Sequence, residues 1–113
     1  MQNKISIAID AMGGENSPTK TLDAVKIFLN KNKEKDDFIL NIFGKEKIIN
    51  EYFEKNSIKS NLVKIINTDT VVSDEETPLT AIKNSKNTSM WNCIKHQVEG
   101  KSDISLSAGN TGV

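Results

Sequence analysis

The sequence predicts an α/β fold, a layered and mostly parallel sheet with helices on both faces. Short runs of apolar residues, or of alternating apolar and polar residues, are each followed by a helical pattern of roughly ten residues. Glycine-rich polar loops follow two of these runs. Strands that alternate with helices in this way pair in parallel through right-handed crossovers. The chain has 113 residues and 36% hydrophobic content, which suits one small packed unit or a piece of one.

The first strand and helix are predicted within residues 5–33. Isoleucines alternate with small or polar residues over 5–10, which is typical of a strand. Ser17 followed by Pro18 predicts a helix, with Ser17 as N-cap and the proline in the first turn. Polar residues 30–33 end that helix. Its apolar stripe consists of Leu22, Val25, Phe28 and Leu29.

The same pattern then repeats. Residues 38–43 predict a strand closed by Gly44, and Asn56 ends the helix that follows. Residues 62–66 predict a third strand, and the pair Thr77-Pro78 predicts a short helix through about residue 85. The apolar face of the helix before Asn56 consists of Ile48, Ile49, Tyr52 and Phe53.

A last helix and strand are predicted over residues 88–106. Thr88 or Ser89 can cap the helix, which stops at Gly100, and residues 103–106 return as a strand. The apolar face of this helix holds Trp91, Ile94 and Val98. A parallel sheet needs helical cover on both faces, and no helix is predicted after the last strand. We therefore expect residues 1–113 to be the N-terminal part of one truncated α/β catalytic domain.

Two glycine-rich loops form the candidate anion site. They are DAMGG at residues 10–14 and SAGNTG at residues 107–112. Ligands of open α/β sheets bind beyond the carboxyl ends of the strands, and glycine lets backbone N–H groups approach phosphate closely. The alternative is that each loop is only a tight strand-to-helix turn. Neither loop carries GxGxxG or a P-loop lysine, so a dinucleotide or nucleoside triphosphate site is not supported.

Single side chains near these loops allow two interpretations each. Asp10 can orient a donor or a water, or it can cap the next turn. Lys83 and Lys86 can bring positive charge to an anion, or they can be solvated lysines. The acidic run at residues 74–76 fits a helix-initiating turn better than a metal site.

Single residues, charge and hydropathy restrict the possible functions further. His96, the sole histidine, has no Ser or Asp partner that spacing identifies, so a surface or packing role is expected. Cys93, the sole cysteine, is expected in the core and cannot form an internal disulfide, which fits a reducing compartment. The 15 basic and 15 acidic residues are interleaved, which argues against nucleic acid. No apolar stretch approaches the roughly 20 residues of a spanning helix, and no secretory signal is visible.

Three segments together resemble the bacterial phosphate acyltransferase family PlsX. They are IAIDAMGGENSP at residues 7–18, DEETPLTAIKNSKNTSM at residues 74–90 and SDISLSAGNTG at residues 102–112. DAMGG and SAGNTG as a pair are more specific than either loop alone. The chain departs from the family pattern at Glu15, where aspartate is common, and at Thr88, which replaces the first serine of a Ser-Ser-Met element.

The resemblance implies a fold related to isopropylmalate dehydrogenase and phosphotransacetylase. It implies transfer of a fatty acyl group from acyl carrier protein to inorganic phosphate, giving acyl phosphate for phospholipid synthesis. A cytoplasmic homodimer that works near the membrane, without metal or nucleotide cofactor, is expected, and the fragment alone should be inactive. No general base is assigned. The expected phosphate or acyl-phosphate contacts are Asp10, Gly13, Gly14, Lys86, Ser89, Asn110 and Thr111.

Two other functions stay open. One is a phosphotransacetylase-like transfer that uses coenzyme A. The other is a non-catalytic anion-binding α/β module that keeps the loops without turnover.

Overall fold

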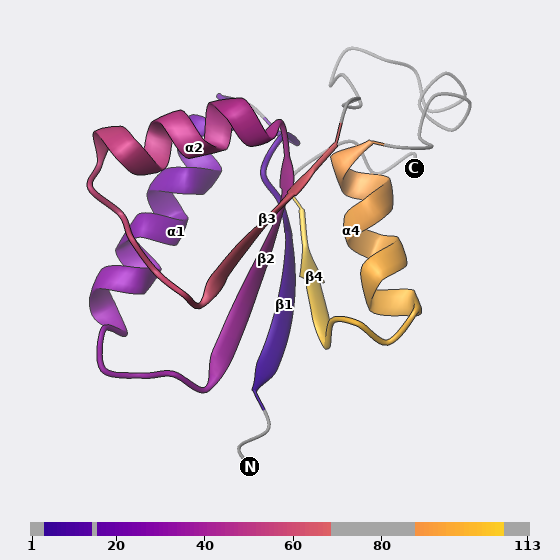
Figure 1. Ribbon diagram of the computed structural model, residues 1–113. Helices are drawn as coiled ribbons and strands as arrows, with labels where there is room; N and C mark the ends of the chain where they lie inside the picture. The colour runs from indigo at the N-terminus through magenta and orange to yellow at the C-terminus, as the bar shows by residue number, and fades with distance from the viewer. Residues whose placement is uncertain (1–3, 15, 69–87, 108–113) are drawn as a thin grey trace.

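The computed structural model describes residues 4–14, 16–68 and 88–107 (Figure 1). Within them, four strands form one parallel sheet in the order β3-β2-β1-β4. The strands are β1 (Ile5–Asp10), β2 (Phe38–Gly44), β3 (Val63–Asn67) and β4 (Ile104–Leu106). The helices are α1 (Thr19–Lys31), α2 (Glu46–Lys55) and α4 (Ser89–Val98). The predicted alternation is confirmed, whereas the helix predicted over 77–85 lies outside the described residues.

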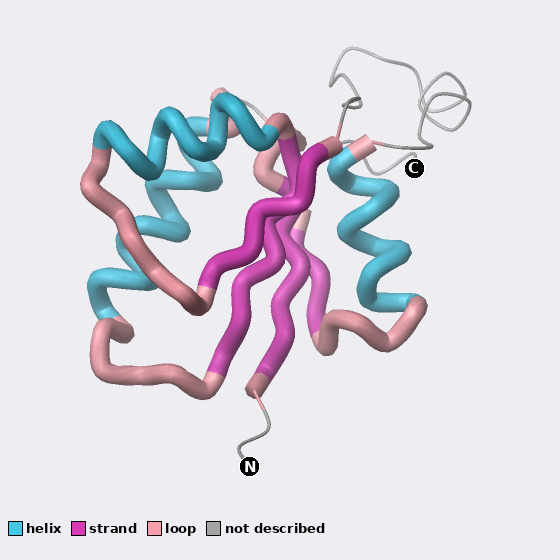
Figure 2. The backbone as a smooth tube through the Cα atoms, viewed as in Figure 1, coloured by secondary structure: helices cyan, strands magenta, loops and turns pink. Residues whose placement is uncertain are grey.

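The helices lie on both faces of the sheet, as predicted. Figure 2 shows the strands between α1 and α2 on one side and α4 on the other. The chain steps outward from β1 to β2 and β3, and then returns past β1 to β4. Because crossovers between parallel strands are right-handed, this change of direction moves α4 to the opposite face. No helix in the described part of the chain is long and apolar enough to cross a membrane.

Alternation along β1 sends its side chains to two different cores. Ile9 belongs to the core under α1 and α2, and Ala8 belongs to the core under α4. The larger core contains Ile9, Ala11, Leu22, Val25, Phe38, Leu40, Ile42 and Ile49. The smaller core contains Ala8, Phe43 and Cys93, with Ile66 packed against it. Among the described residues, the core on the α4 face of the sheet is therefore smaller than the core on the α1 face.

The start of α1 differs from the sequence prediction. The helix begins at Thr19, Pro18 occupies the N-cap position, and no side chain among the described residues caps it. Ser17 was expected to accept a hydrogen bond from the helix, but its hydroxyl donates to the carbonyl of Gly13. The prediction was wrong because the loop before the helix folds back and uses this hydroxyl.

The rotation of α4 also differs from the prediction. Thr88 is the cap, and its hydroxyl accepts from Trp91 N at 3.0 Å. The helix buries Ser89, Met90 and Cys93, so the predicted apolar face is turned outward. Trp91, Ile94 and Val98 are 38%, 41% and 79% exposed. The hydrogen bond from Ser89 to Asp10 fixes the first turn against the sheet, and this contact decides which face is buried.

Candidate anion site at the strand ends

Asp10 ends β1, and its carboxylate joins three segments of the chain. Oδ1 accepts the backbone N–H groups of Met12 and Gly13, at 3.0 and 3.1 Å. Oδ1 also accepts the hydroxyl of Ser89, 79 residues away at the start of α4. Oδ2 accepts the hydroxyl of Ser107 at 2.6 Å, just after β4. One side chain therefore fixes the loop after β1, the first turn of α4 and the end of β4.

This carboxylate is 2% exposed, and Ser89 is equally buried. A buried carboxylate is tolerated when its oxygens are hydrogen-bonded, and here four donors reach them. Both roles that the sequence allowed for Asp10 are present, since it caps the turn and orients two hydroxyl donors. Its negative charge and engaged oxygens suit a positioning role better than direct contact with an anion.

The cluster lies at the point where the strand order of the sheet changes direction. The chain reverses its direction of travel between β1 and β4, and Asp10 and Ser107 lie at the carboxyl ends of these two strands. Ligands of open α/β sheets bind at such a switch point. The hydrogen bond between Asp10 and Ser107 confirms that the two glycine-rich loops begin at the same edge of the sheet.

The loop after β1 is held in a closed turn. Gly13 is buried, its N–H donates to Asp10, and its carbonyl accepts from Ser17. Gly14 has φ of 88°, a backbone conformation that glycine adopts without the strain of a side chain. The N–H of Gly13 is thus committed within the protein, whereas Gly14 lines the neighbouring cavity. Phosphate binding by Gly13 and Gly14 stays a prediction.

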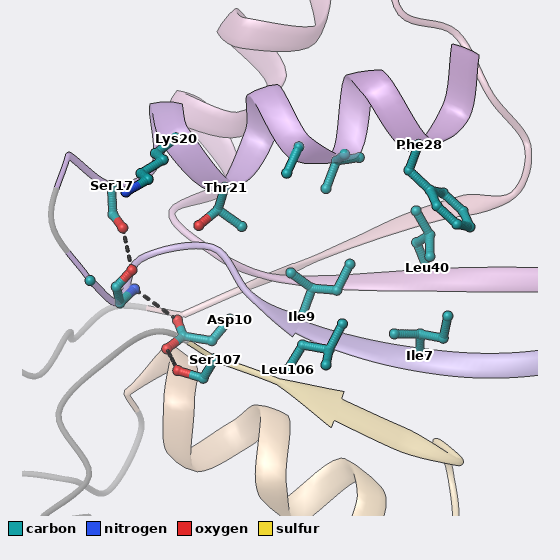
Figure 3. A pocket seen from close by; sticks show the side chains of 14 residues that line it. Ile7, Ile9, Asp10, Ser17, Lys20, Thr21, Phe28, Leu40, Leu106 and Ser107 are labelled. Carbon is teal, nitrogen blue, oxygen red and sulfur yellow. Dashed lines mark hydrogen bonds between the residues drawn. The ribbon is translucent and has the colours of Figure 1, made fainter. Parts of the chain in front are cut away.

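A cavity of about 730 Å³ opens beside this loop, between α1 and the strands (Figure 3). Its volume lies within the roughly 300–1,000 Å³ typical of small-molecule sites. One end is polar and the remainder is mostly apolar. The polar end is lined by Asp10, Gly13, Gly14, Ser17, Lys20 and Ser107.

Lys20 is a site residue that the sequence interpretation missed. It lies in the first turn of α1, is exposed, and is in no ion pair within the part of the chain that the structure describes. The first turn itself contains no acidic residue, so Lys20 lies at the positive end of the helix dipole. The available signal was a lysine two residues after Pro18, in the helix that follows a glycine-rich loop.

Comparison with known proteins decides the family. Residues 5–113 match the model of a family described as "Fatty acid synthesis protein". The chain belongs to this family. Curated relatives named phosphate acyltransferase include proteins of Pelagibacter ubique, 41% identical over 112 residues, and Lactobacillus johnsonii, 42% identical over 108 residues. These matches cover 99% and 95% of this chain, but 32% and 31% of the relatives.

The family is that of the PlsX phosphate acyltransferases, so the resemblance carried by the three sequence segments is confirmed. The chain spans about a third of the length of the curated relatives it matches. Among the candidate PlsX site residues, Asp10, Gly13 and Ser89 are brought together. Lys86, Asn110 and Thr111 lie outside the described residues, as does the acidic run at 74–76.

Cys93 lies in the smaller core, as expected, and His96 packs against the sheet with Ser102 as a partner that the sequence did not identify. Burial raises the pKa of the Cys93 thiol to about 12, with a smaller contribution from the charge of Asp10, so the thiol stays protonated. Nδ1 of His96 lies 2.6 Å from Ser102 Oγ, and its ring packs edge-on against Phe43. Burial, and then the charge of Lys101, lowers the pKa of His96 below its ordinary value.

Proposed function

We propose that this chain is the N-terminal part of an enzyme that transfers a fatty acyl group from acyl carrier protein to inorganic phosphate. One observation carries the proposal: at the switch point, Asp10 holds the glycine loop, Ser89 and Ser107 together beside a cavity with Lys20 at its polar end. Membership of the PlsX family supports acyl carrier protein thioester and phosphate as substrates.

The proposed reaction joins phosphate to the acyl group of a thioester and needs mainly positioning. A phosphate oxygen attacks the thioester carbonyl carbon, the carbon–sulfur bond breaks, and the carrier sulfur leaves and takes up a proton. Negative charge accumulates on the carbonyl oxygen during attack, so nearby cations and neutral donors accelerate the reaction. Lys20 and Lys86 supply cations, and Gly14, Asn110 and Thr111 are the candidate donors from the two glycine-rich loops. Asp10, Gly13 and Ser89 hold these loops in register and are positioning residues.

The family sets the wider expectation. Residues 1–113 would be part of a single catalytic domain related to isopropylmalate dehydrogenase and phosphotransacetylase. The complete enzyme would be a cytoplasmic homodimer that works at the membrane surface and delivers acyl phosphate to a membrane acyltransferase. It would need neither metal nor nucleotide.

A chimera tests this function. Residues 1–113 replace the corresponding segment of the Pelagibacter ubique phosphate acyltransferase, and the chimera is incubated with acyl carrier protein thioester with and without phosphate. We expect release of carrier thiol only with phosphate, and none from residues 1–113 alone. A folded chimera that releases no thiol would contradict the proposal. Phosphate-dependent release from acetyl coenzyme A in place of the carrier would favour the phosphotransacetylase-like alternative, and phosphate binding without turnover would favour the binding module.

A further inference from the structure

We propose that the apolar part of the cavity binds the acyl chain, with the anionic head of the acyl phosphate at the Lys20 end. This inference rests on the proposed function and goes beyond it, because it locates the acyl chain on named surfaces of β1, β4 and α1. The term acyl groove is used below for the apolar lining formed by Ile7, Ile9, Ala24, Val25, Phe28, Leu40 and Leu106.

The floor of the acyl groove is set by strand register. Ile7 lies opposite Leu40 of β2, and Ile9 lies opposite Leu106 of β4. Residues two apart on a strand point to the same face, so Ile7 and Ile9 both point toward α1. From Asp10 back to Ile7 the strand runs roughly 10 Å, at about 3.3 Å per residue. Figure 3 shows Ile9 and then Ile7 and Phe28 at increasing distance from Asp10.

In the part of the chain that the structure describes, the wall opposite this floor is incomplete. Ala24 on α1 is exposed and small, so the helix leaves space above the strands. Phe28 is 38% exposed, and Leu106 is 53% exposed at the edge of the sheet. These surfaces are apolar and meet water, so covering them with methylene groups is favourable. An extended hydrocarbon chain fits a long apolar groove of this kind, since it has no polar groups to leave unpaired.

Charge is confined to one end of the cavity. Lys20 and Asp10 are the charged residues of its lining, and the oxygens of Asp10 already accept four hydrogen bonds. At this end, Lys20 and the start of α1 are available to an anionic head, whereas the Asp10 carboxylate is occupied by its four donors. A ligand with one anionic head and one apolar tail matches this distribution. A nucleotide or a peptide would place polar groups against the apolar floor without partners, which is unfavourable.

Binding of alkyl phosphates tests the groove directly. Dodecyl phosphate and butyl phosphate, both below their micelle-forming concentrations, are titrated calorimetrically into residues 1–113. They share one head and differ in tail length, so their affinity ratio measures burial of the tail. We expect dodecyl phosphate to bind at least roughly tenfold more tightly, because each methylene buried adds affinity.

Three variants identify where the tail lies. Ala24→Trp fills the groove from an exposed helix position and should abolish the affinity ratio. Asn30→Trp, an equally exposed change on α1 away from the lining, should keep it. Lys20→Gln should weaken both phosphates alike and leave the ratio intact. Circular dichroism verifies folding, and Ala24→Leu replaces the tryptophan variant if that variant unfolds.

The proposal is overturned if the wild type shows no preference for the longer tail, or if Ala24→Trp and Asn30→Trp keep the same preference. Its failure is separable from that of the proposed function. A chimera that makes acyl phosphate with a chain-length profile unchanged by Ala24→Trp refutes the groove alone. A chimera without acyl transfer, together with a tail preference that Ala24→Trp removes, refutes the function alone.

Discussion

Ser107 donates a 2.6 Å hydrogen bond to Oδ2 of Asp10, across 97 residues of sequence. This bond joins the end of β4 to the end of β1, at the point where the strand order changes direction. The other oxygen of the same carboxylate accepts Ser89 from the opposite layer. The geometry of the candidate site therefore depends on both carboxylate oxygens of Asp10, because each oxygen accepts from a different segment of the chain.

Asp10→Asn should destabilise the protein although it preserves shape. The neutral amide replaces one acceptor oxygen with a donor, so the acceptor is lost either for Ser107 or for the buried Ser89 hydroxyl and the backbone N–H groups of Met12 and Gly13. The free energy of unfolding should fall by about 1–3 kcal/mol, the cost of leaving one buried polar group unsatisfied. Urea denaturation followed by circular dichroism measures the change. Asp103→Asn is the matched control, because Asp103 is exposed and accepts from Ser6 N at 2.8 Å. Equal losses in the two variants would contradict the central role of Asp10.

Thr88→Ala should loosen α4 by removing its cap. The Thr88 hydroxyl accepts from Trp91 N, and losing a helix cap costs about 0.5–2 kcal/mol. Thr88→Ser keeps the hydroxyl and should lose less stability than the alanine variant. The two midpoints of thermal unfolding, compared with that of the wild type, check this order. If Thr88→Ser loses as much as Thr88→Ala, the methyl group and not the cap matters.

Stability should fall as the solution becomes acidic, and His96 should contribute. The pKa of His96 in the folded protein lies below its ordinary value of 6.5, chiefly because of burial. Below that value the unfolded chain binds a proton that the folded protein does not. The contribution is therefore present above about pH 6.5 and is lost as pH falls toward the folded pKa. The pH dependence of the urea midpoint between about pH 7.5 and pH 5 measures it.

His96→Gln is the comparison for this pH effect. Glutamine does not titrate, so the difference between wild type and variant should shrink as the pH is lowered through that window. A difference that does not change with pH would show that His96 contributes only through packing against Phe43 and its contact with Ser102.

Asn110→Ala should lower activity without unfolding the protein. Asn110 lies between two glycines in SAGNTG, and its amide would donate to phosphate or to the developing oxyanion. Losing one such donor lowers turnover by roughly one to three orders of magnitude. Phosphate-dependent thiol release by the chimera and its thermal unfolding are measured on the same sample. Unchanged kinetics with a lower melting temperature would mean that Asn110 only caps the turn.

The strands were predictable because their signals are local. Alternation in residues 5–10 and the apolar run at 38–43 located β1 and β2 to within a residue. The features that the sequence pattern missed depend on contacts outside the element that carries the pattern. Ser17 has the sequence of a helix cap, yet its hydroxyl donates to Gly13. The periodicity of α4 favoured Trp91, Ile94 and Val98 as its buried face, but the contact of Ser89 with Asp10 turns this face outward.

The candidate site also contains residues with a local sequence signal and residues without one. Asp10 and Ser89 were identifiable from their positions beside a strand end and a helix start. Lys20 was not, because its relevance comes from the space between α1 and β1 and not from a motif. Packing of one element against another creates such a cavity, and periodicity within one element does not reveal it.

The geometry of the candidate site depends on whether the short strand β4 stays paired with the sheet. Within the described residues, β4 has three residues and pairs with β1 alone. When β4 detaches, Ser107 leaves Asp10 and Leu106 leaves the groove in the same opening event. Such local openings need far less free energy than global unfolding. A ligand that contacts the ends of both β1 and β4 would bind only the closed form and would therefore suppress this opening by mass action. Ligand binding should then be measurable as slower amide hydrogen exchange along β4.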